Sequence, residues 1–447
     1  MTPGALESLG DSEMRSAGWA LLAAALWSCS SNSSSPSALT AGAGGQPVPS
    51  AAGTGGVQPS NSGNAGMTGS SAGMTGSSAG MTGGSAGTSS LPTFGGASGG
   101  ETAAIPSYFI GADITDQEPA PAAAQDNLLA LLKAHGFNFI RLRTFVDPKA
   151  VDGYDKTDGY DDLAHTVAFG ARIKAAGIGL LVDFHYSDNW ADPGKQCIPV
   201  AWQGFSTIAA LSEAVHDYTK AAITALVAGG ARPDMVQIGN ETTPGMLLHH
   251  CDTAGQPLTG VTIPIIGAAT SAGWPNLGSL LKAGVAGVRE VDPKILVSLH
   301  IDRGNDFATT KNWLDNALQQ GVKVDAFGES CYQTYQGDPS SVSNTVNGWT
   351  KTFAALTLAY PELKFFAAEY GPLERQINDV LFALPNQQGL GTFAWEPTTQ
   401  GDWNASQPSD PTGTPSHALV QRMGNTYTAL PDLALYDPMK AAYAPRL

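Results

Sequence analysis

Positive charge is scarce in this sequence. Lys and Arg total 23 of 447 residues, against 39 Asp and Glu, which gives a formal net charge of −16. This balance lacks the basic surface that attracts nucleic acids and anionic membranes, so we expect no nucleic-acid partner. A neutral polymer such as a polysaccharide remains compatible with an acidic surface, because its binding requires no electrostatic attraction.

Motifs for metals and nucleotides are also missing. The four cysteines form no CxxC or Cys/His spacing typical of structural zinc, so we predict no metal and no cofactor. No GxGxxG follows the first predicted strand and no P-loop is present, which argues against a nucleotide-binding fold. A metallohydrolase built on His185, His300 and aspartates is the weakest alternative, because HxH and HExxH spacings are absent.

The apolar run near the N-terminus is too short to span a bilayer. Residues 17–27 follow Arg15 and are typical of a signal-peptide core. Acidic residues precede this core, so we predict that translation starts at Met14. The core ends in the letters LWSC, which resemble a bacterial lipobox. Residues 1–29 are therefore interpreted as a signal peptide with lipidation at Cys29, and ordinary cleavage with free secretion is the alternative.

A long segment without charge follows. No residue from Ser30 to Gly100 is charged, and a seven-residue unit that begins at Gly66 recurs twice, the second time with one change. Such a segment buries too little apolar surface to offset its chain entropy. We therefore expect residues 30–104 to be a disordered Ser/Gly/Ala/Thr-rich linker, and a folded domain to occupy residues 105–447.

Short apolar runs alternate with amphipathic stretches in this folded domain. Gly136, Gly177 and Gly321 follow helical runs, where a left-handed residue is favoured. Eight strands separated by helices predict a closed parallel TIM (β/α)8 barrel, with an open doubly wound sheet as the alternative. The predicted strands are 108–112, 139–142, 179–184, 235–238, 295–299, 324–328, 365–368 and 391–394, and the clearest predicted helices are 126–135, 163–176 and 208–228.

Polar and aromatic residues gather where the predicted strands end. In a TIM barrel the active site lies at the carboxyl ends of the strands, and polar groups gathered there are costly to bury unless they form a site. These residues include Asp113, Arg141, Arg143, Asp183, His185, Asp188, Trp190, Asn240, Glu241, His300, Asp302, Glu329, Tyr332, Glu369, Trp395 and Glu396.

Several of these strand ends lie in longer sequence segments: GAD (111–113), IRLR (140–143), DFHYSD (183–188), WADPGKQ (190–196), QIGNETT (237–243) and WEP (395–397). Together these segments resemble glycoside hydrolase family 53, the arabinogalactan endo-β-1,4-galactanases of clan A. The resemblance covers roughly residues 108–447 and implies a TIM barrel that hydrolyses β-1,4-galactan or type I arabinogalactan with retention. It implies Glu241 as the acid/base and Glu369 as the nucleophile.

The chemistry explains why two glutamates are needed. Retaining hydrolysis requires two carboxyl groups about 5–5.5 Å apart. One attacks the anomeric carbon, and the other acts first as an acid and then as a base. Strands four and seven lie on opposite sides of an eight-stranded barrel, so Glu241 and Glu369 can meet over its axis. A rim salt bridge is the alternative for either residue, and Glu329 is the internal rival of Glu369.

The resemblance further implies which side chains hold the sugar and the carboxylates. Asn240 would bond the sugar 2-hydroxyl, with turn capping as the alternative. Arg141 would keep the nucleophile ionised. Arg143 shares its face of the strand and is less favoured, and both arginines could pair with other acids instead. Trp395 would form an apolar platform under the sugar, with core packing as the alternative, and Tyr332 would bond the nucleophile.

Further candidate substrate contacts follow the third and fifth predicted strands. His185 and His300 could bond sugar hydroxyls or brace the carboxylates, and simple packing is the alternative for both. Asp188, in the DFHYSD segment, is also expected at the substrate. Trp190 is a candidate platform at an outer subsite, with Trp202 as a weaker candidate.

The remaining cysteines lie at the predicted rim. Cys197 and Cys251 follow strands three and four, so we predict a disulfide between them in an oxidising compartment, with Cys331 as a buried free thiol. We expect a monomer that is secreted or held on the outer surface of a bacterium.

Three loops depart from the family pattern and leave fewer aromatic platforms: PGMLLHH (244–250), YQTYQG (332–337) and YGP (370–372). The alternatives are therefore a clan A glycosidase for another plant polysaccharide, such as xylan or mannan, and a surface glycan-binding protein without turnover. The resemblance also bears on calcium, which some bacterial members of the family carry in a long loop after the eighth strand. Here the corresponding loop, 398–416, is comparatively short, so no calcium site is predicted.

Overall fold

The computed structural model describes residues 107–260, 263, 266–400 and 418–446. All of these residues belong to one compact unit. The predicted signal peptide, the lipobox, the linker and most of the loop 398–416 lie outside the described residues.

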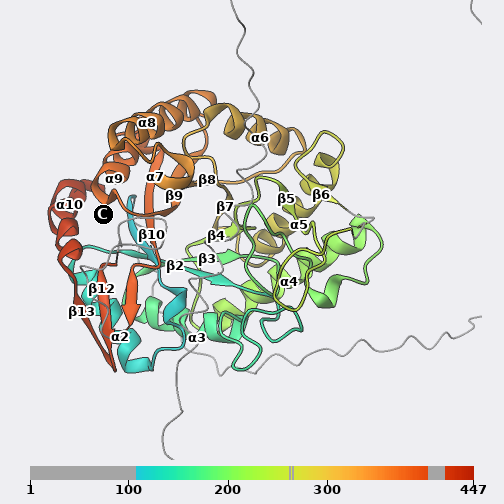
Figure 1. Ribbon diagram of the computed structural model, residues 1–447, viewed down its shortest axis with the longest axis horizontal. Coiled ribbons are helices and arrows are strands. Elements are labelled where there is room, and N and C mark those ends of the chain that lie inside the picture. Colours follow the sequence, from blue (N-terminus) through green and yellow to red (C-terminus); the bar gives the residue numbers. More distant parts are fainter. Residues whose placement is uncertain (1–106, 261–262, 264–265, 401–417, 447) are drawn as a thin grey trace, which may run out of the picture. The chain divides into compact units, whose positions relative to one another are not determined.

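Eight parallel strands close into a barrel, with helices arranged around them (Figure 1). Each strand pairs with its neighbours along the chain, and the first pairs with the last, so that Phe109 lies opposite Gly391. This confirms the TIM barrel and excludes the open sheet. The strands are β1 (Phe109–Asp113), β2 (Phe139–Thr144), β3 (Gly179–Phe184), β4 (Met235–Ile238), β7 (Leu296–Ile301), β8 (Ala326–Cys331), β9 (Lys364–Tyr370) and β10 (Gly389–Trp395).

The helices begin and end where local sequence signals favour it. The side chains of Asp162 and Thr207 accept the backbone N–H three residues on, which caps the two helices that follow. Gly136, Gly177 and Gly321 have positive φ after their helices, as predicted. The helices are α2 (Ala122–Ala134), α3 (Leu163–Ala175), α4 (Ile208–Ala228), α5 (Trp274–Val291), α6 (Phe307–Gln319), α7 (Gln333–Gln336), α8 (Val342–Ala359), α9 (Glu374–Phe382) and α10 (Tyr436–Tyr443).

Two small sheets lie outside the barrel. β5 (Gly245–Met246) and β6 (Gly267–Ala268) form an antiparallel pair in the region after β4. A three-stranded sheet contains β11 (Thr398–Gln400), β12 (Val420–Met423) and β13 (Thr426–Ala429). The sequence patterns predicted neither sheet.

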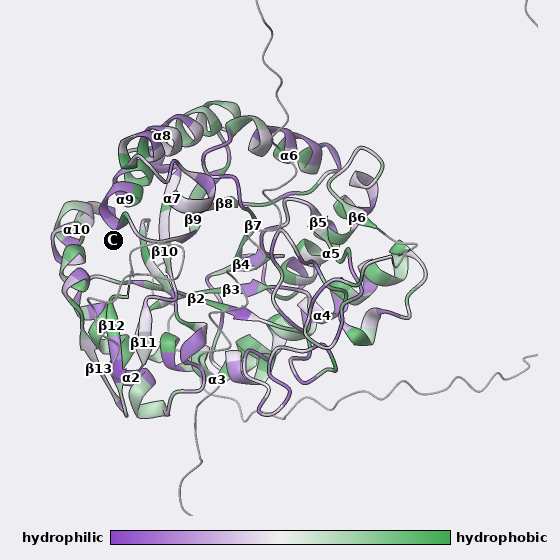
Figure 2. Ribbon diagram, viewed as in Figure 1, coloured by the Kyte–Doolittle hydropathy of each residue, from purple (hydrophilic) through white to green (hydrophobic). Residues whose placement is uncertain are grey.

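Apolar side chains fill the amino-terminal end of the barrel and leave the carboxyl end polar. Phe109, Phe139 and Phe393 belong to one buried cluster inside the barrel. Four residues beyond Phe109, β1 ends at the buried Asp113. A second, larger cluster packs the strands against the helices, and Figure 2 shows both hydrophobic and hydrophilic residues along helices such as α8. The fold therefore places its polar strand ends over a closed apolar floor.

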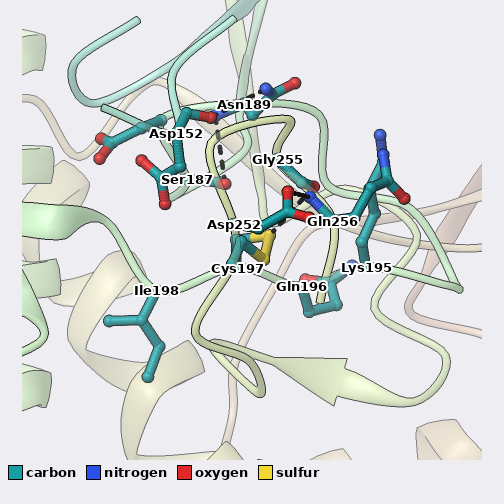
Figure 3. Close-up of a disulfide and its surroundings, with 12 residues drawn as sticks. Asp152, Ser187, Asn189, Lys195, Gln196, Cys197, Ile198, Asp252, Gly255 and Gln256 are labelled. Carbon is teal, nitrogen blue, oxygen red and sulfur yellow. Dashed lines mark hydrogen bonds between the residues drawn. A yellow bond between two sulfur atoms is a disulfide. The ribbon is translucent and has the colours of Figure 1, made fainter. Parts of the chain in front are cut away.

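The predicted disulfide between Cys197 and Cys251 is present, with 5.8 Å between the two Cα atoms. It joins the loop after β3 to the loop after β4, and Figure 3 shows Gln196 and Asp252 beside it. Cys331 is a buried free cysteine, as predicted. Both loops begin at strand ends that carry candidate active-site residues.

Candidate active site

A buried arginine organises the carboxyl end of the barrel. Arg141 on β2 donates to Asp113 Oδ2 at 2.8 Å, to Asp183 Oδ2 at 2.7 Å and to Asn240 Oδ1 at 2.8 Å. Its Nη2 atom also lies 3.2 Å from Glu369 Oε1. Burial by itself lowers the pKa of Arg141. The nearby acids Asp183, Glu369 and Asp113 raise this pKa by more than burial lowers it, so the guanidinium stays charged. One fixed cation thus joins four strand ends.

Glu369 lies beside this cation, as predicted for the nucleophile. Its Oε2 accepts a hydrogen bond of 3.1 Å from the Tyr332 hydroxyl. Burial raises its pKa to about 7, while Arg141 and the bond from Tyr332 act in the opposite direction. The Tyr332 hydroxyl donates to the carboxylate, and the Arg141 guanidinium places a positive charge beside it. Both effects favour the ionised form of Glu369.

A β-bulge aims Glu369 into the site. In the pairing of β8 with β9, Glu329 lies opposite Ala367 but Ser330 lies opposite Glu369, so β9 carries one extra residue, Ala368. A bulge bends the strand and redirects the next side chain. The register shift therefore brings Glu369 level with Ser330 at the end of the barrel.

Glu241, three residues beyond the end of β4, lies in a different environment. Its backbone has a positive φ of 44°, and it follows Gly239, whose φ is 79°. The residue is partly exposed, and its Oε1 lies 2.5 Å from the Ser330 hydroxyl. Burial raises the pKa of Glu241 well above the usual value, and Glu369 and Asp302 raise it further. Two neighbouring carboxyls whose surroundings differ in this way are suited to an acid and a nucleophile.

The rival glutamate lies elsewhere. Glu329 accepts hydrogen bonds from the Thr310 hydroxyl of α6 at 2.7 Å and from the backbone N–H of Arg303 at 2.8 Å. It is fully buried. Its contacts with α6 place it on the outer face of the barrel, so Glu329 does not replace Glu369.

The two predicted histidines serve as internal braces. His185 accepts from the backbone N–H of Ala191 at Nδ1, 2.9 Å away, and its Nε2 lies 3.0 Å from Asp183. His300 Nδ1 lies 2.9 Å from Asn240 Oδ1, and its Nε2 lies 2.9 Å from the Ser330 hydroxyl. Burial lowers the pKa of both rings, so both are neutral. Bracing, one of their two predicted functional roles, is the one that these contacts support.

Asp188 also bonds the protein itself. Its two oxygens accept the backbone N–H groups of Asp147 at 3.0 Å and Val200 at 2.7 Å. The residue is 1% exposed. Asp188 therefore ties together the loops after β2 and β3, in contrast to the expected place at the substrate.

Aromatic rings form one wall of the site. Trp395, at the end of β10, and Trp190, in the loop after β3, meet edge to face with 5.8 Å between centroids. The Arg143 guanidinium lies 4.0 Å from the Trp190 centroid and 5.6 Å from that of Trp395. Trp395 and Trp190 are both partly exposed, as a sugar platform requires. Trp202 packs into the hydrophobic core instead.

Arg143 holds a second group of acids beside this wall. It bonds Asp161 at 3.0 Å and Glu396 at 2.8 Å. This matches the alternative in which the second arginine pairs with other acids, while Arg141 takes the place beside Glu369.

Two polar residues of the site were not predicted. Ser330 contacts Glu241, and Gln237 donates to Asp183 Oδ1 at 2.6 Å. A signal for Ser330 exists, because residues two apart on a strand share a face and Ser330 precedes Tyr332 by two. Among the residues that the structure describes, no group of three or more His, Cys, Asp or Glu could hold a metal ion.

Comparisons with known proteins agree with this geometry. The model of glycosyl hydrolase family 53 matches residues 115–365. The arabinogalactan endo-β-1,4-galactanase of Thermothelomyces thermophilus is 33% identical over 294 residues, which cover 60% of this chain and 80% of that protein. The endo-β-1,4-galactanase of Bacillus subtilis (strain 168) is 27% identical over 296 residues, or 61% of this chain and 64% of that protein.

Solved structures are similar as well. The catalytic domain of family GH53 from Ignisphaera aggregans has a TM-score of 0.56 and 25% identity, and the match covers 75% of this chain and 98% of that one. A fungal β-1,4-galactanase has a TM-score of 0.54 and 26% identity, covering 69% and 90%. No helix in the described part of the chain is long and apolar enough to cross a membrane.

Proposed function

Because the chain belongs to glycosyl hydrolase family 53, we propose that this glycosidase is a retaining endo-β-1,4-galactanase with Glu369 as nucleophile and Glu241 as acid/base. The observation that carries the proposal is the contrast between the two carboxyls. Arg141 and Tyr332 hold Glu369 in a form suited to attack, whereas Glu241 meets the Ser330 hydroxyl.

In the first half of the reaction, a Glu369 oxygen forms a bond to the anomeric carbon while the bond to the leaving oxygen breaks. Glu241 gives its proton to that oxygen, so the shortened chain departs as a neutral alcohol. A covalent glycosyl-enzyme remains. Arg141 holds the attacking carboxylate in place, and Tyr332 bonds the oxygen Oε2.

In the second half, Glu241 takes a proton from water as the water oxygen bonds to the anomeric carbon. The bond to Glu369 breaks and its carboxylate is restored. Two displacements at one carbon retain the β configuration. Glu369 near Arg141 is again the stable leaving carboxylate.

The substrate proposal combines the site with the relatives. Trp395 and Trp190 offer apolar faces that suit the C–H surface of a pyranose. The net charge of −16 suits a neutral chain better than an acidic one. The curated relatives from T. thermophilus and B. subtilis are named for β-1,4-galactan, which supports galactan over xylan or mannan.

Reducing-sugar release from potato galactan, arabinogalactan, xylan and mannan tests this proposal. Cleavage of galactan that is lost in Glu369→Gln, with β-anomeric products in proton NMR, is the expected result. Preferential cleavage of xylan or mannan would favour the alternative clan A specificity. Binding of galactan without cleavage of any polymer would favour the glycan-binding alternative.

We also propose that the domain 105–447 is secreted and tethered to the outer surface by lipidated Cys29 and the linker 30–104, and that it acts as a monomer. The apolar core 17–27, the LWSC letters and the uncharged linker support this. Labelling with a radioactive fatty acid, compared with Cys29→Ala, tests the anchor. Light scattering of the protein tests the monomer.

A further inference from the structure

One serine hydroxyl joins the proposed acid to the buried centre of the site. Ser330 Oγ lies 2.5 Å from Glu241 Oε1 and 2.9 Å from His300 Nε2. Ser330 is fully buried. A hydroxyl has a single proton and can donate to only one of these partners, so the other partner must donate to it. The position of the protons on His300 decides which partner that is.

The orientation of Asn240 fixes the proton on His300. Asn240 Oδ1 accepts from Arg141 at 2.8 Å, and its Nδ2 donates to the Ala191 carbonyl at 2.8 Å. A flipped amide would turn its NH2 group toward the guanidinium, so Oδ1 is the acceptor that faces His300 Nδ1 at 2.9 Å. Two acceptors cannot bond each other, and His300 Nδ1 must therefore carry the hydrogen.

Donors near His300 Nδ1 are weaker competitors. The Gln237 side-chain nitrogen lies 3.2 Å away, but it also donates to Asp183 at 2.6 Å. The backbone N–H of Glu241 lies 3.5 Å away, at the limit of a hydrogen bond. Both contacts are longer than the 2.9 Å contact with Asn240 Oδ1, so the tautomer with hydrogen on Nδ1 satisfies the site best.

The direction of the whole chain of bonds follows. His300 is neutral because burial and the nearby Arg141 lower its pKa, so with hydrogen on Nδ1 its Nε2 is an acceptor. Ser330 donates to that nitrogen. The hydroxyl oxygen then has only lone pairs to offer at its short contact with Glu241. As long as Ser330 donates to His300, the contact is a hydrogen bond only when Glu241 is protonated and donates.

We propose that Ser330 and His300 are positioning residues that hold the proton on Glu241 before glycosidic cleavage, through bonds that run from Glu241 to Ser330, to His300 Nε2, and from His300 Nδ1 to Asn240. This inference rests on the proposed function, in which Glu241 is the acid. The chain of bonds connects the proton donor to Asn240, which Arg141 holds beside Glu369.

After Glu241 has given up its proton, the Ser330 hydrogen can turn to the carboxylate, and that bond by itself lowers the pKa of Glu241. The turn leaves the buried His300 Nε2 without its donor. The protonated form of Glu241 therefore keeps both bonds of Ser330, whereas the ionised form keeps one. In the first half of the reaction Ser330 accepts from the acid, and in the second it donates to the base.

Other groups also act on the charge of Glu241. Glu369 faces it from β9, Asp302 from the end of β7, and Asp192 from the loop after β3. Tyr332, after β8, is close enough for Glu241 to raise its pKa. Substitution of Ser330 leaves all four in place, so a change of titration in that variant reports the hydroxyl.

The test is the pH profile of kcat/KM for Ser330→Ala, with Ser330→Thr as the variant that restores the hydroxyl. Removing an acceptor of the protonated form lowers the pKa of Glu241. We therefore expect the alkaline limb to move to lower pH by roughly one unit, and the threonine variant to return it. Ser298→Ala is the matched control, because Ser298 is a buried β7 residue that donates to the Val236 carbonyl at 3.0 Å.

Movement of the alkaline limb to higher pH would mean that Ser330 donates to the carboxylate, and an unmoved limb would mean that it has no influence. Either result overturns the inference. A shift equal to that of Ser298→Ala would also overturn it.

NMR titration of isotope-labelled glutamate side-chain carboxyls gives the pKa of Glu241 without turnover, with Glu241→Gln to assign the signal. A lowered pKa in Ser330→Ala supports the inference even if no polymer is cleaved, in which case only the proposed function fails. Cleavage of galactan with an unchanged or raised pKa refutes the inference alone.

Discussion

Removing the disulfide should cost stability while leaving the catalytic groups in place. The double variant Cys197→Ser/Cys251→Ser opens a loop that spans a sequence separation of 54 residues. In the chain-entropy model, a cross-link over that separation stabilises the folded state by about 4 kcal/mol. Domains have a total stability of about 5–15 kcal/mol, so a large share of the free energy of unfolding depends on this bond.

The native loops keep other contacts. The Ile198 N–H donates to the His249 carbonyl at 2.8 Å, and the Leu248 N–H donates to the Gln196 carbonyl at 2.7 Å. These bonds hold the loops after β3 and β4 together beside the cross-link. We therefore expect kcat/KM of the double variant to match that of the parent at temperatures where both are folded.

Urea unfolding followed by tryptophan fluorescence measures the loss. Reductant should lower the free energy of unfolding of the parent and leave that of the double variant unchanged, and Cys331→Ala should keep its sensitivity to reductant. A loss below about 1 kcal/mol would refute the loop-closure reasoning. An equal effect of reductant on both proteins would refute the role of this disulfide.

Three further predictions concern catalysis. Arg141→Lys should reduce kcat by roughly 100-fold, because an ammonium cannot bond Asp113, Asp183 and Asn240 in one fixed fork; retention of half the parent rate would contradict this. Tyr332→Phe removes the 3.1 Å bond to Glu369 and should lower kcat by roughly fivefold, with little change in thermal melting. The profile of kcat/KM against pH should be bell-shaped. Activity is lost on the acid side, as the nucleophile Glu369, with a pKa of about 7, gains a proton. It is lost again on the alkaline side, as the acid Glu241, whose pKa is raised by burial and by Glu369, loses its own proton. In Glu241→Gln, the acid limb should stay in place and the alkaline limb should disappear. Loss of the acid limb instead would mean that Glu241 is the nucleophile and Glu369 the acid.

Most of the barrel could be predicted because buried parallel strands appear as short apolar runs. The ends were less predictable. β9 continues to Tyr370 and β10 to Trp395, beyond their predicted last residues, because polar strand ends remain paired inside a closed barrel. The sheet of β11–β13 was missed because β12 and β13 alternate only weakly and because β12 pairs with β11 across a long stretch of chain.

The site divides in a similar way. Glu241, Glu369, Arg141 and Tyr332 could be placed because strand ends of one barrel converge on one face. The hydrogen-bond partners of Asp188 could not be predicted from the sequence, because they are backbone N–H groups of separate loops. The choice between Glu329 and Glu369 also needed the structure, since a bulge in β9 sets which residue faces Ser330.

Trapping of the covalent intermediate tests the central claim most directly. A 2-deoxy-2-fluoro galactoside with an activated leaving group should inactivate the enzyme and label one side chain, which peptide mass spectrometry can locate. We predict the label on Glu369, with none in Glu369→Gln. A label on Glu241 or Glu329, or hydrolysis of galactan with inversion and no label, would contradict the assignment of Glu369 as the nucleophile.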